Sequence, residues 1–157
     1  MKIIIISGSV GTGKTTLSKK ISKTLNYEYL DVSKLIKDKK LADDYDTENK
    51  CAIVDVKKLN KVLIEIIKKS ENLIIDSHLS HYLPKKYVDF CIVTTCDITI
   101  LRDRLKKRNY SANKIKNNIE AEIFDTIVIE AKDKKYNLLV VNTSEGYKLK
   151  DIVEFIK

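Results

Sequence analysis

The segment at residues 3–15 constrains the fold of this chain more than any other. Four consecutive isoleucines at residues 3–6 lead into the sequence GSVGTGKT at residues 8–15, which fits the pattern G-x-x-x-x-G-K-[ST]. An apolar run without alternation is typical of a strand buried on both faces of a parallel sheet. Glycines placed between a strand and a helix let successive backbone N–H groups point into one concave anion site. The segment therefore predicts a strand, a phosphate-binding loop and a helix, in that order.

The predicted loop assigns contacts to a nucleotide. Lys14 should reach the β- and γ-phosphates of ATP, and the Thr15 hydroxyl should bind Mg²⁺. A second contact to Mg²⁺ is expected from an acid that ends a neighbouring buried strand, and Asp76 is the only candidate of that form. The alternative for Asp76 is an acid that only caps the following turn. The expected loop contacts to ATP are Gly8, Gly11, Thr12, Gly13, Lys14, Thr15 and Thr16.

Two histidines, His78 and His81, follow Asp76 closely. An imidazole beside the phosphates could orient a water molecule or an acceptor group. Alternatively, His78 only satisfies backbone groups of the turn after the strand. The spacing H-x-x-H offers no third ligand, so it does not favour a metal site. The three cysteines lack C-x-x-C spacing and lie in apolar stretches, so we expect buried free thiols.

The arginines are concentrated in one place. Only three of the 30 basic residues are arginines, and they are Arg102, Arg104 and Arg108. Arg104 and Arg108 are four positions apart, so on a helix they share a face and would converge on one phosphate chain. The alternative is a solubilising helix surface in a lysine-rich protein. The net charge of +8 favours polyanionic ligands such as nucleotides or RNA.

Apolar strands alternate with helical patterns along the chain. The pattern predicts strands at residues 2–7, 27–30, 72–76, 88–94 and 137–141, and helices after the glycine loop and at 55–69, 97–107, 111–131 and 146–156. This order is typical of one α/β domain over residues 1–157, with a parallel sheet between two helix layers. Two polar segments, 31–54 and 107–117, are candidates for mobile lids. No apolar run is long enough to span a membrane, so we expect a soluble intracellular protein.

Several stretches together resemble the adenylate kinase-like ATPases of archaea and eukaryotes that assist late assembly of the small ribosomal subunit. The resemblance covers roughly residues 1–131. It is carried by the loop at 8–16 (family G-x-x-G-x-G-K-T-T), Tyr45-Asp46 ahead of Cys51, Asp76-Ser77-His78 (family D-x-H), 83–89, 101–110 (family L-x-x-R-L-x-x-R-G-Y) and 117–124 (family N-I-x-x-E-I-F).

This resemblance implies a P-loop nucleoside monophosphate kinase fold with five parallel strands, a monophosphate-binding insert near 31–54 and a short lid near 107–117. It implies ATP–AMP phosphotransfer with Mg²⁺, a slow ATPase activity, and cytoplasmic work on small-subunit rRNA processing. The implied partners are ATP, AMP, a small-subunit ribosomal protein and pre-rRNA, with no membrane. Arg108 would contact ATP from the lid, and Asp76 and His78 would be the magnesium- and ATPase-linked pair. The expected catalytic set is Lys14, Asp76, His78, Arg104 and Arg108.

The chain departs from the family pattern at three positions. Val10 replaces a proline of the loop, which should alter loop stiffness more than chemistry. Asn109 replaces a glycine, and asparagine tolerates the left-handed backbone region better than most residues. Lys37 stands where the family often has arginine, so the acceptor phosphate would be held by Lys34 or Lys37 as point charges, or by Arg104. An assembly ATPase with incidental kinase activity is therefore the alternative function, whereas D-x-H disfavours a kinase of shikimate type.

Overall fold

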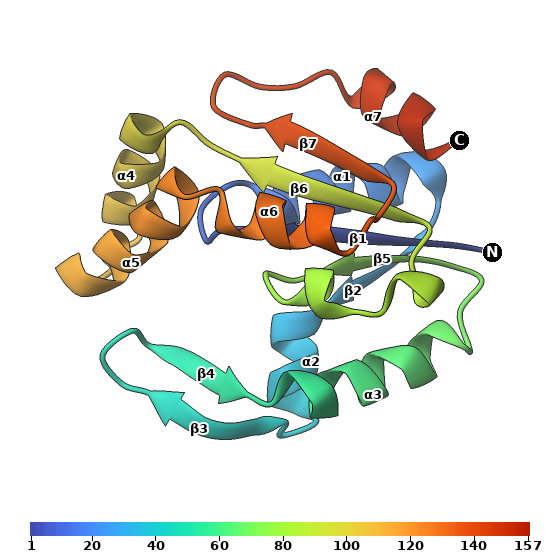
Figure 1. The fold of residues 1–157 in the computed structure, drawn as a ribbon, viewed down its shortest axis with the longest axis horizontal. Coiled ribbons are helices and arrows are strands. Elements are labelled where there is room, and N and C mark those ends of the chain that lie inside the picture. The colour runs from blue at the N-terminus through green and yellow to red at the C-terminus, as the bar shows by residue number, and fades with distance from the viewer.

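The computed structural model describes all residues from 1 to 157. Its centre is a parallel sheet of five strands in the order β2-β5-β1-β6-β7 (Figure 1). The strands are β1 (Lys2–Gly8), β2 (Glu28–Asp31), β5 (Asn72–Asp76), β6 (Phe90–Thr95) and β7 (Leu138–Asn142). Each of them coincides with a predicted strand to within two residues at either end, which confirms the α/β fold with five parallel strands.

Helices cover both faces of the sheet (Figure 1). Helices α1 (Lys14–Leu25) and α7 (Leu149–Ile156) pack on one face, and α3 (Val56–Ile67) and α6 (Thr126–Asp133) pack on the other. Strand β1 serves both layers, because Ile4 and Ile6 join the first cluster and Ile3 and Ile5 join the second. All four isoleucines are at most 1% exposed. This double burial explains why the strand shows no polar alternation.

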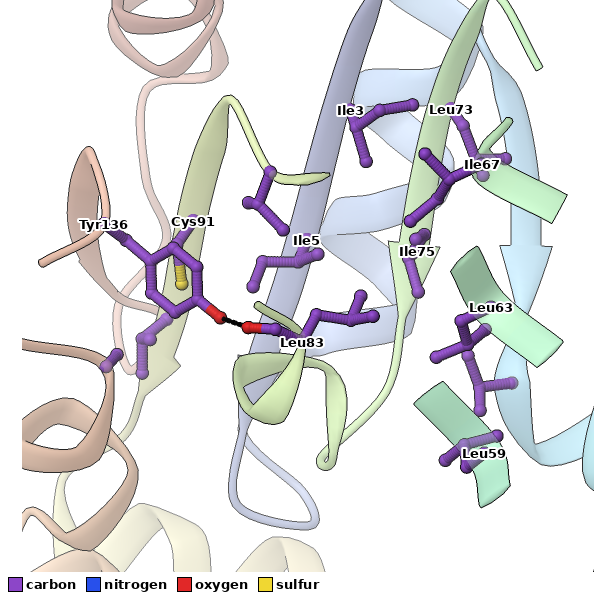
Figure 2. Packing of buried hydrophobic residues seen from close by; sticks show 14 of the residues in the cluster. Ile3, Ile5, Leu59, Leu63, Ile67, Leu73, Ile75, Leu83, Cys91 and Tyr136 are labelled. Atoms are coloured by element: carbon purple, nitrogen blue, oxygen red, sulfur yellow. Dashed lines mark hydrogen bonds between the residues drawn. The ribbon is translucent and has the colours of Figure 1, made fainter. Parts of the chain in front are cut away.

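The larger apolar cluster joins distant parts of the chain (Figure 2). Leu63 and Ile67 of α3 pack against sheet residues such as Ile75. On the other side, the buried ring of Tyr136 lies near Cys91, and its hydroxyl donates a hydrogen bond to the carbonyl of Leu83. The segment after β5 is thereby fixed against the sheet by both packing and a buried polar contact.

Two polar segments contain more regular structure than the sequence pattern indicated. Residues 31–54 hold α2 (Val32–Asp38) and a hairpin of β3 (Ala42–Asp46) and β4 (Cys51–Val54), which extends away from the sheet below α5 (Figure 1). The lid region holds the end of α4 (Ile98–Lys107) and the start of α5 (Ala112–Ile123). At the joint between them Asn109 has φ 55°, so the expected left-handed backbone is present.

Other sequence-based expectations need correction. The single helix expected at 111–131 is two helices, α5 and α6, because Asp125 adopts a left-handed conformation with φ 50°. The last helix begins at Leu149, three residues later than expected, after Gly146 at φ 97°. Cys91 and Cys96 are buried free thiols as expected, but Cys51 is exposed on the hairpin. None of the helices is long and apolar enough to cross a membrane.

Candidate active site

The glycine loop lies at the carboxyl end of the central strand. Strand β1 has β5 on one side and β6 on the other, so the loop occupies the point where the strand order switches direction. Gly8 has φ +144°, and a Cβ there would lie 2.5 Å from the carbonyl oxygen of Thr94. Gly13 has φ +91° and forms the N-cap of α1. Because side chains are excluded at both positions, the backbone N–H groups remain open toward a bound anion.

A cleft of about 310 Å³ opens above this loop. Its walls come from four segments that are far apart in the sequence: the loop, the start of α2, the end of β5, and the joint between α4 and α5. The lining residues are Val10, Gly11, Gly13, Lys14, Thr15, Thr16, Asp31, Ser33, Asp76, Ser77, His78, Arg108, Tyr110 and Lys114. Most of these residues are polar or charged, which suits a phosphate-bearing ligand more than an apolar one.

Lys14 lies inside the loop and donates a hydrogen bond from Nζ to the carbonyl of Ser9 at 2.8 Å. Burial lowers the pKa of Lys14 to about 8. Asp76 and Glu122 oppose this shift, and the charge of Arg108 adds to it. An ammonium that is partly desolvated and close to another cation gains more from an incoming anion than a lysine in water does.

Thr15 and Asp76 meet at the base of the cleft. The Thr15 hydroxyl donates to Asp76 Oδ2 at 2.6 Å. Asp76 also pairs in register with Ile6 of β1 and with Asp31 of β2, so it stands at the carboxyl ends of three adjacent strands. Hydroxyl and carboxylate oxygens are ligands that Mg²⁺ prefers, and they are already side by side here. The pair therefore fits the metal that accompanies ATP.

Tyr29 also belongs to this group, and sequence reasoning missed it. Its hydroxyl donates to Asp76 Oδ2 at 2.8 Å, which is the same oxygen that Thr15 contacts. Partial burial and the neighbouring Asp76 carboxylate raise the pKa of Tyr29, so the phenol stays protonated and acts as a donor. The available signal was the position of Tyr29 one residue before the end of the strand predicted at 27–30.

His78 faces the same cleft from the segment after β5. Desolvation of the ring between the cleft walls lowers the pKa of His78 to about 4. The positive charges of Lys14, His81 and Lys114 act in the same direction. Because the pKa is shifted downward, the imidazole is neutral at pH 7, while part of the residue stays open to solvent. His81, in contrast, is buried at 2% exposure behind the loop, so the two histidines do not form one site.

The two arginines expected to act together point to different places. Arg108 lines the cleft, where the sequence placed it. Arg104 does not line it: its guanidinium donates to the carbonyl of Thr143 at 2.8 Å and to that of Gly11 at 3.3 Å. The expected convergence on one phosphate chain is therefore absent, because Arg104 is engaged by backbone oxygens behind the loop.

Known proteins with similar sequences share the region that forms this site. A family model described as an AAA domain matches residues 4–125, which include the loop, Asp76 and the lid. The Drosophila melanogaster protein named "Adenylate kinase isoenzyme 6 homolog" is 40% identical over 130 residues, covering 83% of this chain and 74% of the relative. The Dictyostelium discoideum protein of the same name is 38% identical over 138 residues, covering 88% and 78%. This chain belongs to the adenylate kinase-like family of P-loop proteins.

Solved structures support the fold of this adenylate kinase-like chain without bearing on its substrate. The shikimate kinase from Acinetobacter baumannii, in complex with shikimate, has a TM-score of 0.65 at 14% identity and covers 98% of this chain and 89% of its own. The shikimate kinase from Aquifex aeolicus has a TM-score of 0.58 at 14% identity, with 97% and 91% covered. Identities this low show a shared P-loop kinase fold alone.

The segment expected to bind the acceptor monophosphate differs from the sequence-based expectation. Lys34 and Lys37 of α2 are exposed and lie outside the lining of the cleft. The start of α2 presents Asp31 and Ser33 to the cleft instead. Asp31 is the N-cap of α2 and accepts from the Lys34 backbone N–H at 3.1 Å, which fixes the start of the helix at the cleft. In this adenylate kinase-like chain, neither lysine contributes to the cleft in the observed conformation.

The insert and the lid touch each other through residues that do not line the cleft. Asn113 donates from its side-chain amide to the carboxylate of Glu48 at 2.8 Å, and Asn117 donates to Asn49 at 3.4 Å. Behind this contact, the ammonium of Lys114 lies 4.0 Å from the centre of the Tyr110 ring. These polar contacts are exposed, so they hold the two segments together weakly and would allow the cleft to open.

Proposed function

We propose that this protein transfers the γ-phosphate of ATP to a nucleoside monophosphate, with AMP as the acceptor, and that it hydrolyses ATP slowly when no acceptor is bound. The observation that carries the proposal is the cleft itself. Lys14 and Arg108 both line the space above the phosphate loop, where the charge of Arg108 helps to lower the pKa of Lys14, and the same cleft continues to the start of α2. The family membership supports a nucleotide kinase. The acceptor and the ATPase activity belong to the proposal.

In this reaction an oxygen of the acceptor phosphate forms a bond to the γ-phosphorus of ATP. The bond between that phosphorus and the β–γ bridging oxygen breaks, and two nucleoside diphosphates leave. Such a transfer places little covalent work on the protein and requires positive charge around the moving phosphoryl group. Lys14 and Arg108 would supply that charge, and the backbone N–H groups of the loop would hold the β-phosphate.

Thr15 and Asp76 would hold the Mg²⁺ that accompanies ATP. The ion would neutralise charge on the β- and γ-phosphate oxygens. Tyr29 would keep the Asp76 carboxylate in place through its hydrogen bond of 2.8 Å. His78, which is neutral and open to the cleft, would position an attacking water or an acceptor group.

A second candidate function is favoured by the weak acceptor clamp. The insert contributes no arginine, and both of its candidate lysines lie outside the cleft. A protein with these properties would turn over AMP poorly. It would then serve as an ATP-switched binder of a small-subunit ribosomal protein and pre-rRNA in small-subunit maturation. The net charge of +8 is compatible with an RNA partner.

One assay tests both proposals. Phosphate transfer is measured with MgATP plus each nucleoside monophosphate, and hydrolysis is measured with MgATP alone, each with and without a purified small-subunit ribosomal protein. A rate that depends strongly on AMP supports the kinase. Hydrolysis that depends on the ribosomal protein supports the assembly ATPase. A protein that shows neither dependence would overturn both.

A further inference from the structure

A chain of three polar side chains, buried at Ser7 and His81 and partly exposed at Glu130, lies next to the phosphate loop. The Nδ1 atom of His81 is 2.9 Å from the hydroxyl of Ser7, and its Nε2 atom is 2.7 Å from a carboxylate oxygen of Glu130. Ser7 is fully buried and His81 is 2% exposed. A serine, a histidine and a carboxylate are thus connected in line by two short hydrogen bonds, and the proposed phosphotransfer uses none of them.

The protonation state of His81 defines how the chain is connected. Burial lowers the pKa of His81, and the nearby Glu130 carboxylate opposes that shift only in part. A neutral imidazole has one donor and one acceptor nitrogen. Nε2–H therefore donates to Glu130, and Nδ1 accepts from the Ser7 hydroxyl, an assignment that follows from the carboxylate being unable to donate.

This arrangement resembles the hydrogen-bonding order of a hydrolytic triad, but burial excludes that chemistry. A nucleophile must contact substrate, and the Ser7 hydroxyl has no exposed surface. It also does not line the cleft above the loop. The hydrogen-bonded group of Ser7, His81 and Glu130 therefore connects structural elements and is not a second active site.

The elements that it connects all bear on the cleft. Ser7 immediately precedes Gly8, the first residue of the phosphate loop. His81 lies in the short 3₁₀ turn η1 (Ser80–Tyr82), which follows the segment carrying Asp76 and His78. The segment that leads into this turn is fixed to β1, because the Ser77 N–H donates to the carbonyl of Ile6 at 3.1 Å.

Glu130 links this hydrogen-bonded group to the helices that follow the lid. It lies on α6, which packs against both β1 and η1. Helix α6 continues from α5 through the left-handed residue Asp125, and the first turns of α5 carry Lys114 at the cleft. Tyr82 strengthens the same connection, since its hydroxyl donates to Glu130 at 3.2 Å. A movement of α6 would therefore displace the Glu130 carboxylate, to which both His81 and Tyr82 are hydrogen-bonded.

We propose that Ser7, His81 and Glu130 form a relay that couples the phosphate loop to helices α5 and α6, with His81 as the positioning residue. Through it, a nucleotide in the loop and a closed lid stabilise each other. The relay rests on the proposed function only in that the loop binds ATP. Its existence within the protein does not depend on which acceptor is phosphorylated.

The test uses conservative variants, each of which removes or weakens one bond of the relay. Glu130→Gln keeps the size of a side chain that is 37% exposed and lies away from the cleft, and Ser7→Ala removes the other end of the relay. His81→Gln places its amide near the Nε2 position, so it keeps a contact to Glu130 and loses Ser7. Glu154→Gln is the matched control, because Glu154 is an exposed helical glutamate on α7 that pairs only with Lys150.

The first measurement is amide hydrogen exchange in the nucleotide-free protein. We expect Glu130→Gln to speed exchange in residues 8–15 by about three- to tenfold, the scale of a charge-assisted hydrogen bond reduced to a neutral one, with α7 unchanged. The Glu154→Gln control should match wild type. Unchanged exchange in residues 8–15 in both Glu130→Gln and His81→Gln would overturn the relay. If Ser7→Ala does not fold, these two variants decide the question.

The second measurement is calorimetric binding of a non-hydrolysable ATP analogue with Mg²⁺. We expect Glu130→Gln to weaken binding about three- to tenfold, and the Ser7→Ala/Glu130→Gln double variant to bind no worse than the weaker single one. Additive losses would mean that the residues act independently and would contradict the relay. A wild-type protein that binds no analogue contradicts the proposed function instead, and hydrogen exchange still judges the relay.

Discussion

Arg104 and Thr143 fasten the back of the phosphate loop to the segment after β7. The guanidinium donates to both oxygens of Thr143, at 2.8 Å to the carbonyl and 3.1 Å to the hydroxyl. The Thr143 hydroxyl in turn donates to the carbonyl of Thr12 in the loop at 2.6 Å. Arg104 was expected to bind a phosphate of the ligand. It instead stabilises the loop that binds the phosphates, through Thr143 and the Gly11 carbonyl.

Arg104→Lys should consequently destabilise the protein. Lysine keeps the charge but lacks the planar fork that reaches two oxygens of one residue and the Gly11 carbonyl together. We expect a loss of about 1.5–3 kcal/mol in the free energy of unfolding, the range for hydrogen bonds to a charged group. Urea denaturation measures it. Arg102→Lys is the control, because Arg102 is an exposed residue on the same helix. Equal stability of the two variants would contradict this role.

Lys14→Ala should abolish most phosphotransfer. Its ammonium lies in the loop and would neutralise charge on the γ-phosphate as it moves. Losing one preorganised electrostatic contact costs about two to three orders of magnitude in rate. The measurement is kcat with MgATP and AMP, beside Lys23→Ala, which removes an exposed lysine from α1. Wild-type turnover in Lys14→Ala would remove the loop from the mechanism.

The pKa of Lys14 makes a separate prediction about ATP affinity. Because that pKa is about 8 in the free protein, a growing fraction of Lys14 is neutral as the pH rises above 8. Binding of the phosphates requires the charged form, so a proton is taken up and affinity falls with rising pH. The apparent Kd for MgATP should rise about fivefold between pH 8 and pH 9, the effect of a single proton. Lys14→Arg should remove this dependence, since guanidinium stays charged. A flat wild-type profile from pH 7 to 9.5 would disprove the assignment.

Arg108→Lys tests whether the lid arginine acts through the planar geometry of its guanidinium or through its positive charge alone. Arg108 lines the cleft and is otherwise an exposed residue at the end of α4. If it contributes only positive charge, the lysine variant should turn over normally. We expect kcat to fall about tenfold or more with unchanged stability, because lysine cannot hold two phosphate oxygens in one plane. Steady-state kinetics and thermal melting, beside Arg102→Lys, check this.

The sequence predicted the sheet well because burial on both faces leaves a direct trace in composition. The isoleucines of β1 show no alternation, and they occupy both apolar clusters. The phosphate loop was equally clear, since only glycine fits the space beside Thr94. Asn109 shows that even a departure from the family pattern was readable, because its left-handed backbone follows from its short polar side chain.

The contacts that long side chains make could not be predicted from the sequence in the same way. The spacing of Arg104 and Arg108 indicated one helix face, but Arg108 is the C-cap of α4, and Arg104 bends toward a segment 39 residues later in the chain. Tyr29 and Asp76 are 47 residues apart and meet only because β2 and β5 are neighbours. Such contacts depend on strand order, which no local pattern contains.

The structure also narrows the roles open to His78. If this residue only satisfied the turn after β5, its ring would hydrogen-bond to the backbone there. Other side chains do that work instead: the Ser77 hydroxyl accepts from the Leu79 N–H at 3.0 Å, and the Ser80 hydroxyl donates to the Ser77 carbonyl at 2.8 Å. No hydrogen bond joins the His78 ring to the protein, and the ring faces the cleft. A functional role is therefore favoured over a structural one.

His78→Gly tests which of the two proposed functions this neutral imidazole serves. A water molecule in the open cleft is loosely held, whereas an acceptor bound at the insert has its own contacts. Removal of the ring should therefore lower ATP hydrolysis more than AMP phosphorylation, by about tenfold or more in the ratio of the two rates, within the range for one positioned acid–base group. The melting temperature should stay close to that of wild type, since the ring forms no hydrogen bond to the protein.

The two rates are measured in the same preparation, with His78→Asn as a variant that keeps a polar side chain at the cleft. Equal loss of both activities in a destabilised variant would show that His78 supports the turn. Selective loss of hydrolysis in a stable one would make it part of an ATP-driven switch.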